Sequence, residues 1–340
     1  MKLRKSTVKA ILIAIIIALL ALIVGMMVKT HIDKKRMAEE MVAEPEETVI
    51  YGDEYLGIDP DVDIQLAGYR NVLIMGLDTE HIENEEGNRS DAIVIVSINK
   101  ENQAVKMFSV YRDTYLKIND DYGYDKVNHA YAFGGIPLST YAINTNLDLN
   151  IRETIALTWE TVRYMVDELD GITINILPEE VAPLNGMLAD EHHISSSGEQ
   201  VINGEQAVQY CRMRYDSSDF RRNERFKDVL AQAFRKTQQL DNVQRAELAE
   251  DMLDLIVSNV PNKTVAETML EISGYDIKSS TEWPYYKRGW TDERAIYYAV
   301  PVDLQKNVSE LHYNIFDQEE YIPTDRVLEI KEGISERTGI

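Results

Sequence analysis

Cysteine is almost absent from the chain, which has only Cys211 among its 340 residues. A single cysteine excludes an intramolecular disulfide, and six scattered histidines without a Cys/His cluster argue against a structural zinc site. Positive charge is also scarce, because 35 Lys and Arg stand against 58 Asp and Glu, a formal net charge of -23. Nucleic-acid binding needs a broad basic surface, so this balance argues against that function. Internal repeats and low-complexity blocks are absent too.

One apolar run does stand out, at residues 10–28, where nineteen residues carry no charge. This is the length that a helix needs to cross the hydrocarbon core of a membrane. No small-residue cleavage site directly follows Val28, so we predict an uncleaved anchor rather than a signal peptide. Four positive charges precede the run and four follow it, so charge does not orient the span.

After the predicted anchor, an acidic segment with little periodicity extends to residue 67 and indicates a spacer. From Gly68 onward, apolar runs rich in β-branched residues alternate with helical patterns. The runs predict strands at 72–75, 92–98, 105–110, 172–177 and 295–300, and the helical patterns predict helices at 159–169, 204–210, 221–240, 246–258 and 265–272. Interleaved strands and helices predict an α/β fold, with a mixed central sheet flanked by helices in an α-β-α sandwich.

Five arginines gather in residues 210–226, with the sequence YCRMRYDSSDFRRNERF. Against so acidic a background they indicate a local anion site, because a planar guanidinium pairs with two phosphate oxygens at once. Arg212 and Arg214 are two apart, so an extended segment would point both to one face. Arg222 lies four residues before Phe226, and Arg225 lies four before Val229. This spacing places both arginines on the apolar, core-facing side of a helix.

That helix is expected to start near Ser218 or Asp219, so its first-turn amides could also face an anion. A solvated basic helix end, neutralised by Asp216, Asp219 and Glu224, fits the same residues equally well.

Polar residues also stand where the predicted strands begin or end. Asp78 follows the first strand, Arg89 and Asp91 precede the second, and Arg112 and Asp113 follow the third. Sites are often built on such loops at the edge of a sheet. Two carboxylates beside arginines suit a hard cation such as magnesium that bridges a phosphate. Each aspartate alone also fits a turn or a helix cap, and Arg112 with Asp113 fits a local salt bridge.

A further polar group lies in YDKVNHAYAFGG, residues 124–135. Lys126 could reach a phosphate as a point charge. His129 fits a hydrogen-bonded structural histidine better than a ligand.

Taken in order, these motifs resemble the LytR-CpsA-Psr family of cell-wall glycopolymer transferases. They are GLD at 76–78, RSD at 89–91, YRDT at 111–114, KVNHAYAFGG at 126–135, NGEQAVQYCRMR at 203–214 and DFRRNER at 219–225. Each motif is short, but six in the right order and at similar spacing are specific. The resemblance covers roughly residues 69–240 well, and more loosely the remainder to about residue 316.

The resemblance implies a membrane-anchored phosphotransferase with its N-terminus in the cytoplasm and its domain on the extracytoplasmic face. Such an enzyme moves a teichoic-acid-like or capsular glycopolymer from a polyprenyl-pyrophosphate carrier to peptidoglycan, and a deep apolar cavity holds the lipid tail. The expected parts are a cytoplasmic N-terminus at 1–9, the transmembrane helix at 10–28, the spacer at 29–67, the catalytic domain at 68–320 and a tail at 321–340.

Carried over residue by residue, the resemblance assigns six cations to the pyrophosphate: Arg89, Arg112, Lys126, Arg212, Arg214 and Arg222. It assigns a magnesium ion to Asp78 and Asp91. Fixed cations of this kind stabilise the charge that builds on phosphate oxygens during transfer, so Arg112 is expected to be catalytic. The first candidates for a general base are Asp113 and Asp219, because both stand among the arginines.

Two positions depart from the family pattern. Glu80 stands where an arginine is frequent, and Phe226 stands where glutamine is usual. Two alternatives to the transferase stay open. One is a hydrolase of the polyprenyl pyrophosphate, and the other is a non-catalytic regulator that binds the same lipid, which the loss of one cation and one amide donor favours.

Overall fold

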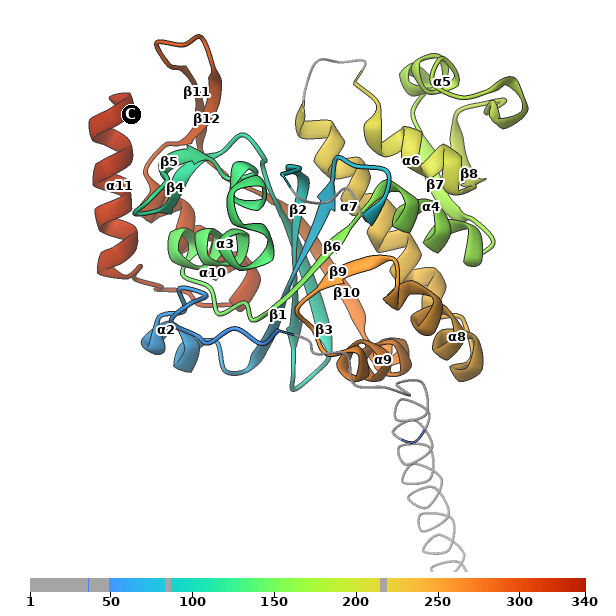
Figure 1. The fold of residues 1–340 in the computed structure, drawn as a ribbon, viewed down its shortest axis with the longest axis horizontal. Helices are drawn as coiled ribbons and strands as arrows, with labels where there is room; N and C mark the ends of the chain where they lie inside the picture. Colours follow the sequence, from blue (N-terminus) through green and yellow to red (C-terminus); the bar gives the residue numbers. More distant parts are fainter. Residues whose placement is uncertain (1–35, 37–48, 83–86, 215–218) are drawn as a thin grey trace, which may run out of the picture.

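A six-stranded mixed sheet lies at the centre of the molecule, in the strand order β10-β3-β2-β1-β6-β9 (Figure 1). The structure is a computed structural model that describes residue 36 and residues 49–82, 87–214 and 219–340, the side chains of 219–223 excepted. The strands of the sheet are β1 (Tyr69–Leu77), β2 (Ser90–Asn99), β3 (Ala104–Val110), β6 (Glu153–Leu157), β9 (Ile256–Ser258) and β10 (Asp276–Trp283). β2 runs antiparallel to both β1 and β3, whereas β6 is parallel to β1 and β10 is parallel to β3.

Helices cover both faces of this sheet, as Figure 1 shows. They are α2 (Pro60–Gln65), α3 (His129–Leu147), α4 (Trp159–Glu168), α5 (Pro178–Asn185), α6 (Gly204–Arg212), α7 (Asp219–Thr237), α8 (Asn242–Leu253), α9 (Asn262–Glu271), α10 (Leu304–Phe316) and α11 (Asp325–Thr338). Three two-stranded sheets complete the fold: β4 (Tyr115–Asn119) with β5 (Gly123–Lys126), β7 (Ile172–Ile176) with β8 (Gly198–Ile202), and β11 (Lys287–Thr291) with β12 (Tyr297–Pro301).

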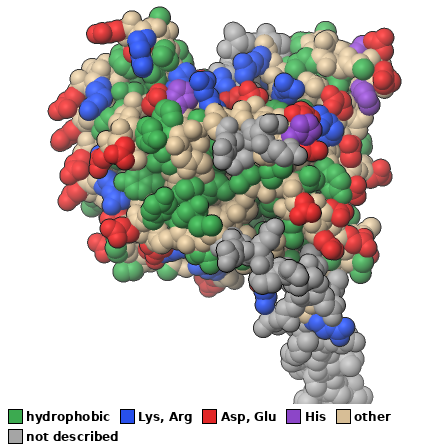
Figure 2. All heavy atoms as spheres, in the orientation of Figure 1, with side chains coloured by type: hydrophobic (Ala, Val, Ile, Leu, Met, Phe, Trp, Pro, Cys, Tyr) green, Lys and Arg blue, Asp and Glu red, His purple; other side chains and the backbone are tan. Residues whose placement is uncertain are grey.

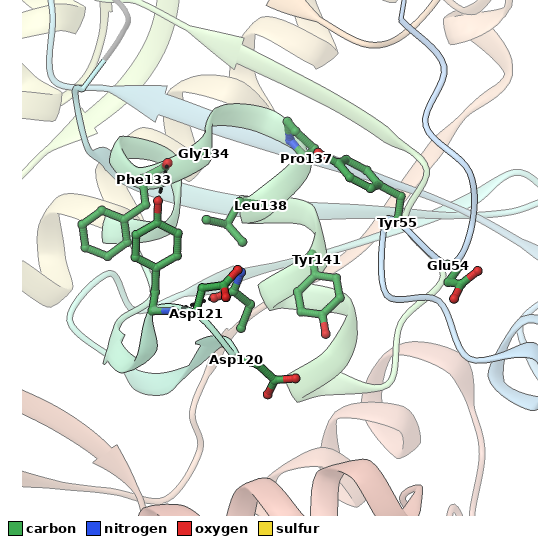
Figure 3. Close-up of a pocket in the computed structure, with 11 residues that line it drawn as sticks. Glu54, Tyr55, Asp120, Asp121, Phe133, Gly134, Pro137, Leu138 and Tyr141 are labelled. Atoms are coloured by element: carbon green, nitrogen blue, oxygen red, sulfur yellow. Dashed lines mark hydrogen bonds between the residues drawn. The ribbon is translucent and has the colours of Figure 1, made fainter.

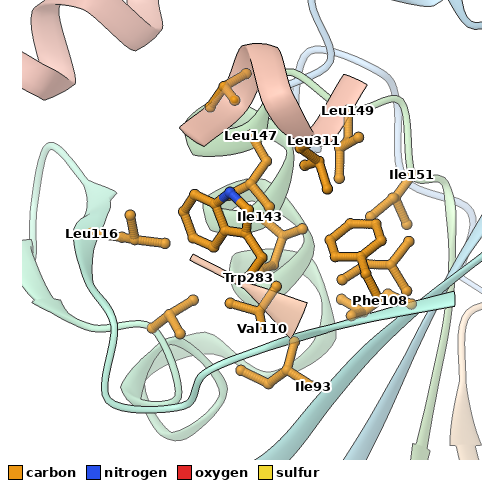
Figure 4. Close-up of a cluster of buried hydrophobic side chains, with 14 of the residues drawn as sticks. Ile93, Phe108, Val110, Leu116, Ile143, Leu147, Leu149, Ile151, Trp283 and Leu311 are labelled. Atoms are coloured by element: carbon orange, nitrogen blue, oxygen red, sulfur yellow. The ribbon is translucent and has the colours of Figure 1, made fainter. Parts of the chain in front are cut away.

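Alternating side chains of the central strands divide the interior into two hydrophobic cores. Leu73 and Ile93 enter the core that contains α3, α10 and α11, while Val94 and Met107 enter the core that contains α4, α6 and α7. Figure 4 shows part of the first core, where Trp283 of β10 lies among side chains of α3 and β3. The predicted mixed α/β fold, with a central sheet flanked by helices, is therefore confirmed.

The folded part begins earlier than the predicted boundary at Gly68. Leu56, Val62 and Leu66 are 0–1% exposed, and the last two belong to the core around α3. The sequence pattern does not indicate that this segment is folded, because it is rich in acidic residues and has few apolar ones. The helix α2 is also only six residues long. Part of the segment assigned to the spacer is thus a packed component of the domain.

The predicted tail is also part of the core. α11 buries Val327, Ile330 and Ile334 against the same cluster, so the sequence boundary at residue 321 does not separate a distinct unit. Two other boundaries were wrong. The helix predicted for 246–258 ends at Leu253, because residues 256–258 pair with β6 instead. The helix predicted for 204–210 continues to Arg212.

The predicted membrane anchor at 10–28 lies outside the described residues. Within the part of the chain that the structure describes, no helix has the length and hydropathy needed for a membrane span.

Candidate functional site

The polar motifs converge because several strands end at the same edge of the sheet. β1, β3, β6 and β10 point one way and β2 points the other, so the C-terminal ends of four strands meet the beginning of β2. In Figure 2, Lys and Arg side chains gather along the upper edge of the molecule, between the β11–β12 hairpin and the α5–α6 region. This edge is where the sequence placed its candidate site.

Arg112 lies at the centre of an ion-pair network whose carboxylates are buried, while the side chain of its outermost member, Arg214, is 58% exposed. Its Nη1 donates to Asp91 Oδ1 at 2.7 Å, and its Nε lies 3.7 Å from Asp113 Oδ2. Lys126 Nζ lies 2.8 Å from the other oxygen of Asp113, and Arg214 Nη2 lies 3.8 Å from Asp91 Oδ2. Three predicted cations and two predicted carboxylates therefore form one cluster.

Backbone contacts hold this cluster in place. The amide of Asn128 donates to the carbonyl of Arg112, and the amide of Ala299 donates to the carbonyl of Asp113. The amide of Tyr111 donates to the carbonyl of Trp283, which ends β10. The loop after β3 is thus fixed from three sides, and fixed charges need little reorganisation when an anion arrives.

Asp91 owes its position to an irregularity in the β1–β2 ladder. Gly76 pairs with Ala92 and Leu77 pairs with Ser90, so Asp91 is the extra residue of a bulge. A bulge redirects the side chain of its extra residue. Asp91 turns toward Arg112 although it begins a buried strand, and its side chain is only 5% exposed.

A second group lies around Trp159, the first residue of α4. Its indole Nε1 lies 3.4 Å from Asp78 Oδ1, and the guanidinium of Arg212 lies 5.8 Å from the ring centroid. Because β1 and β6 are parallel, the residues after them, Asp78 and Trp159, meet at the edge. Trp159 was not predicted as a site residue. The one feature of the sequence that could have indicated its role is its position just after the short strand β6.

Arg89, Arg222 and Asp219, three of the predicted residues, have side chains that are exposed or lie outside the described residues. Arg89 lies next to Asp78, since its carbonyl accepts from the Asp78 amide at 3.2 Å, but its side chain is exposed. The side chains of Arg222 and Asp219 lie outside the described residues, although α7 begins at Asp219. Their assigned roles stay predictions.

The two departures from the family pattern have defined contacts. Glu80 Oε1 lies 2.5 Å from Arg163 Nη1, and Arg163 Nε lies 2.9 Å from Glu205. Phe226 is 1% exposed, and a Cβ added to Gly76 would lie 3.0 Å from its ring. Phe226 therefore packs beneath the GLD motif, whereas Glu80 joins an ion-pair network with α4 and α6.

A carboxyl pair that the sequence did not reveal lies near the same edge. Burial and a hydrogen bond to the Glu224 carboxyl raise the pKa of Glu282 on β10 to about 8. Lys227 Nζ donates to the neighbouring carbonyl of Thr281 at 3.2 Å. Glu282 pairs across the sheet with Ser109, three residues before Arg112. The sequence gave no sign of this pair because its members are 58 residues apart.

An apolar cavity of about 200 Å³ lies between the sheet and helices α7, α8 and α9. Ile74, Val96 and Ile155 form its sheet side, and Leu230 and Phe234 of α7 form part of the opposite wall. Ile74 is four residues before Asp78, a distance of roughly 13 Å along the strand. The cavity therefore lies within the same domain, a short way from the group formed by Asp78 and Trp159.

Asp78 and Asp91, the carboxylates that the resemblance assigns to a magnesium ion, lie at the same edge of the sheet. Asp78 and Asp91 flank the β1–β2 connection, and the Asp78 side chain is exposed. No cluster of three or more His, Cys, Asp or Glu suited to a metal occurs among the described residues. Magnesium is often held by one or two carboxylates while phosphate oxygens and water complete its octahedron. The donor type and number agree with that arrangement.

Fold and site together define an α/β protein that has a basic site at the edge of its sheet and an apolar cavity beside it. A family model described as the LytR_cpsA_psr family matches residues 26–311. The chain therefore belongs to the LytR-CpsA-Psr family.

Individual relatives agree with this assignment. The chain is 30% identical over 244 residues to the polyisoprenyl-teichoic acid–peptidoglycan teichoic acid transferase TagU of Bacillus licheniformis, which covers 71% of this chain and 75% of that protein. The solved structure of TagT bound to LIIa-WTA superposes with a TM-score of 0.59 at 21% identity, over 88% of this chain and 98% of the other. The family protein YwtF (TagT) with bound octaprenyl pyrophosphate lipid gives 0.54 at 20% identity, over the same shares of the two chains.

Proposed function

We propose that this protein is a membrane-anchored phosphotransferase that moves a glycopolymer from a polyprenyl-pyrophosphate carrier to peptidoglycan. The observation that carries the proposal is the combination of a fixed cation network with an apolar cavity in one domain. A lipid pyrophosphate has the matching chemistry, an anionic head on an apolar chain. The names of the relatives TagU and TagT, and the octaprenyl pyrophosphate in one solved structure, support the same ligand class.

In the proposed reaction a hydroxyl of the acceptor sugar attacks the phosphorus that carries the glycopolymer. An oxygen–phosphorus bond forms to the acceptor, the bond to the bridging oxygen of the pyrophosphate breaks, and lipid monophosphate leaves. The hydroxyl proton passes to a base or to water. Negative charge grows on the phosphate oxygens, and Arg112, Lys126 and Arg214 are placed to stabilise it.

Asp113 is better suited to position these cations than to accept the proton. One of its oxygens contacts Lys126 and the other faces Arg112, and its side chain is 7% exposed. Protonation would weaken both ion pairs. Arg89, Arg212 and Arg222 remain proposed pyrophosphate ligands, and Asp219 remains a candidate base.

Asp78 and Asp91 would hold the magnesium ion. When bound, such an ion neutralises charge on the phosphate oxygens of the carrier. Asp91 already faces Arg112 and Arg214, so it would link the ion to the cation network.

The run at residues 10–28 would anchor the chain in the cytoplasmic membrane, with the domain on the extracytoplasmic face. This placement brings the cavity to the lipid carrier and the basic site to the wall. Nucleic acid is not an expected partner, because the chain is acidic.

A reconstitution with the full-length protein in detergent tests the function. Magnesium, a polyprenyl-pyrophosphoryl saccharide and peptidoglycan fragments should give a linked product, detected by mass spectrometry. Release of lipid phosphate without an acceptor would identify a hydrolase instead.

The pairing of Glu80 with Arg163 favours one further candidate, a regulator that binds the lipid without turnover, because a cation frequent in the family is replaced here. Lipid binding with no product of any kind would support that candidate and contradict the transferase.

A further inference from the structure

A groove follows the kink in α3, on the face of the domain that carries β4 and β5. Gly134 and Gly135 leave helical geometry, and Gly135 adopts a φ of 60°, which favours glycine. Two cavities, of about 660 and 590 Å³, adjoin this kink and share Gly134 and Pro137 in their linings. The two cavities therefore adjoin each other at the kink, and both are open to solvent.

Exposed aromatic rings form the walls of the larger cavity. Tyr122 and Phe133 stack with ring centroids 4.6 Å apart, yet they stay 49% and 38% exposed. On the opposite side Tyr55 is 63% exposed and stacks on Tyr51. Figure 3 shows Phe133 and Tyr55 on opposite sides, with Leu138 between them. Aromatic faces presented in this way suit ligands with flat apolar surfaces, such as the C–H faces of sugar rings.

The charge of the groove selects among possible ligands. The described residues that line the two cavities include no Lys or Arg, whereas Glu54, Asp120 and Asp121 line the larger one. Asp120 pairs with Lys117 at 2.6 Å, whereas Glu54 and Asp121 form no ion pair with a described Lys or Arg. A chain of phosphates would be repelled here, while hydroxyl and amide groups could donate to these oxygens.

The groove is connected to the cation network by β5. Tyr122 directly precedes this strand and Lys126 ends it, so the two are roughly 13 Å apart along an extended chain. His129 lies between them, since its Nδ1 is 2.9 Å from Asp125 and its ring is 5.8 Å from that of Phe133. A polymer lying in the groove could therefore place one sugar near the phosphate site.

We propose that this groove binds an uncharged glycan strand, the acceptor of the transfer, and excludes the anionic polymer of the donor. The inference rests on the proposed function, which requires both polymers at one site. It adds the location of the acceptor and the basis on which the two polymers are distinguished.

Calorimetry on the full-length protein in detergent tests the binding. The probes are a hexamer of β-1,4-linked N-acetylglucosamine and a glycerol phosphate hexamer. The first should bind, and the double substitution Tyr122→Ala with Phe133→Ala should weaken it by about tenfold or more, because two stacking surfaces are lost. Tyr313→Ala, which removes another ring that is 55% exposed, is the matched control and should leave the affinity unchanged.

The role of the acidic residues that line the groove can be tested in an independent measurement. Glu54→Gln with Asp121→Asn should increase binding of the glycerol phosphate hexamer, because the repulsion is reduced. The inference is overturned if the wild type does not bind the sugar hexamer, if the double aromatic variant binds it equally well, or if the anionic hexamer binds the wild type as tightly.

Transfer kinetics separate this inference from the proposed function. The aromatic variant should raise the KM for the peptidoglycan fragment while binding of the polyprenyl pyrophosphate stays unchanged. If the sugar binds in the groove but no transfer occurs with any acceptor, the proposed function is wrong and the assignment of the groove as a glycan-binding site still holds. If transfer occurs and the KM for the peptidoglycan fragment does not change, the assignment of the groove is wrong and the proposed function still holds.

Discussion

Arg112 and Asp91 form a hydrogen-bonded ion pair at 2.7 Å across the ends of two adjacent strands. Arg112 follows β3 and Asp91 begins β2, so the sheet itself brings them together. Their side chains are 15% and 5% exposed, which lowers the effective dielectric around the pair. The arrangement holds a guanidinium in a fixed position at the proposed phosphate site.

Replacement of Arg112 by lysine tests whether this guanidinium geometry is needed. The charge is retained, but the planar fork that contacts Asp91, and that we propose to contact two phosphate oxygens, is lost. We expect transfer to fall by about 10²- to 10³-fold, as for loss of one fixed stabilising donor. Arg294→Lys is the control, because Arg294 pairs with Asp292 on an exposed turn. Transfer within threefold of wild type for Arg112→Lys would contradict the role.

The part of the site carried by long strands could be predicted from sequence. Asp78, Asp91 and Arg112 each adjoin an apolar β-branched run, and the pattern of such runs was enough to place them at strand ends. These strand ends meet because of the directions in which the strands run in the sheet. The sequence does not indicate those directions. β6, which places Trp159, has only five residues and gave too short a pattern to recognise.

Most of the features that the sequence did not predict depend on contacts between segments that are far apart in the chain. The helix α3 combines two adjacent glycines and an internal proline, so its sequence predicts no helix although tertiary packing stabilises one. The stack of Tyr122 on Phe133 joins a hairpin turn to this helix, and no local pattern distinguishes these rings from core aromatics. Arg225 was correctly predicted to face inward, but its partner Glu180 lies on another helix.

The buried pair of Arg225 and Glu180 should be important for stability. Nε of Arg225 lies 3.0 Å from Glu180 Oε1, and both side chains are 3% exposed. Arg225→Met would leave a buried carboxylate without this cation, which costs about 3–5 kcal/mol. Urea unfolding followed by circular dichroism should show this loss, and adding Glu180→Leu should recover a large part of it. Equal stability of the single and double variants would contradict this account.

Glu282 should make the protein less stable as the pH rises. Burial, and then the neighbouring Glu224 carboxyl, raise its pKa from the ordinary value of 4.5 to about 8. Between these two values the folded state binds more protons than the unfolded state, so the free energy of unfolding falls as the pH increases. Glu282→Gln, which mimics the protonated form, should therefore stabilise the protein relative to wild type progressively from pH 4.5 to pH 8. Urea titrations at several pH values measure this difference, and parallel curves for the two proteins would refute the assignment.

His312 should have the opposite effect at lower pH. Burial lowers its pKa to about 4 from 6.5, and this effect outweighs the hydrogen bonds to Gln318 and to the carbonyl of Leu147, which act in the opposite direction. The unfolded state then binds more protons between pH 6.5 and about 4, so stability is present above pH 6.5 and is lost as the pH falls through this window, by at most about 1.4 kcal/mol per pH unit. His312→Gln removes the titrating group but keeps a side chain that can donate to Leu147. The free-energy difference between wild type and variant should be constant above pH 6.5 and shrink toward pH 4, while His81→Gln controls for loss of an exposed imidazole. A constant difference down to pH 4 would show that His312 is not buried in its neutral form.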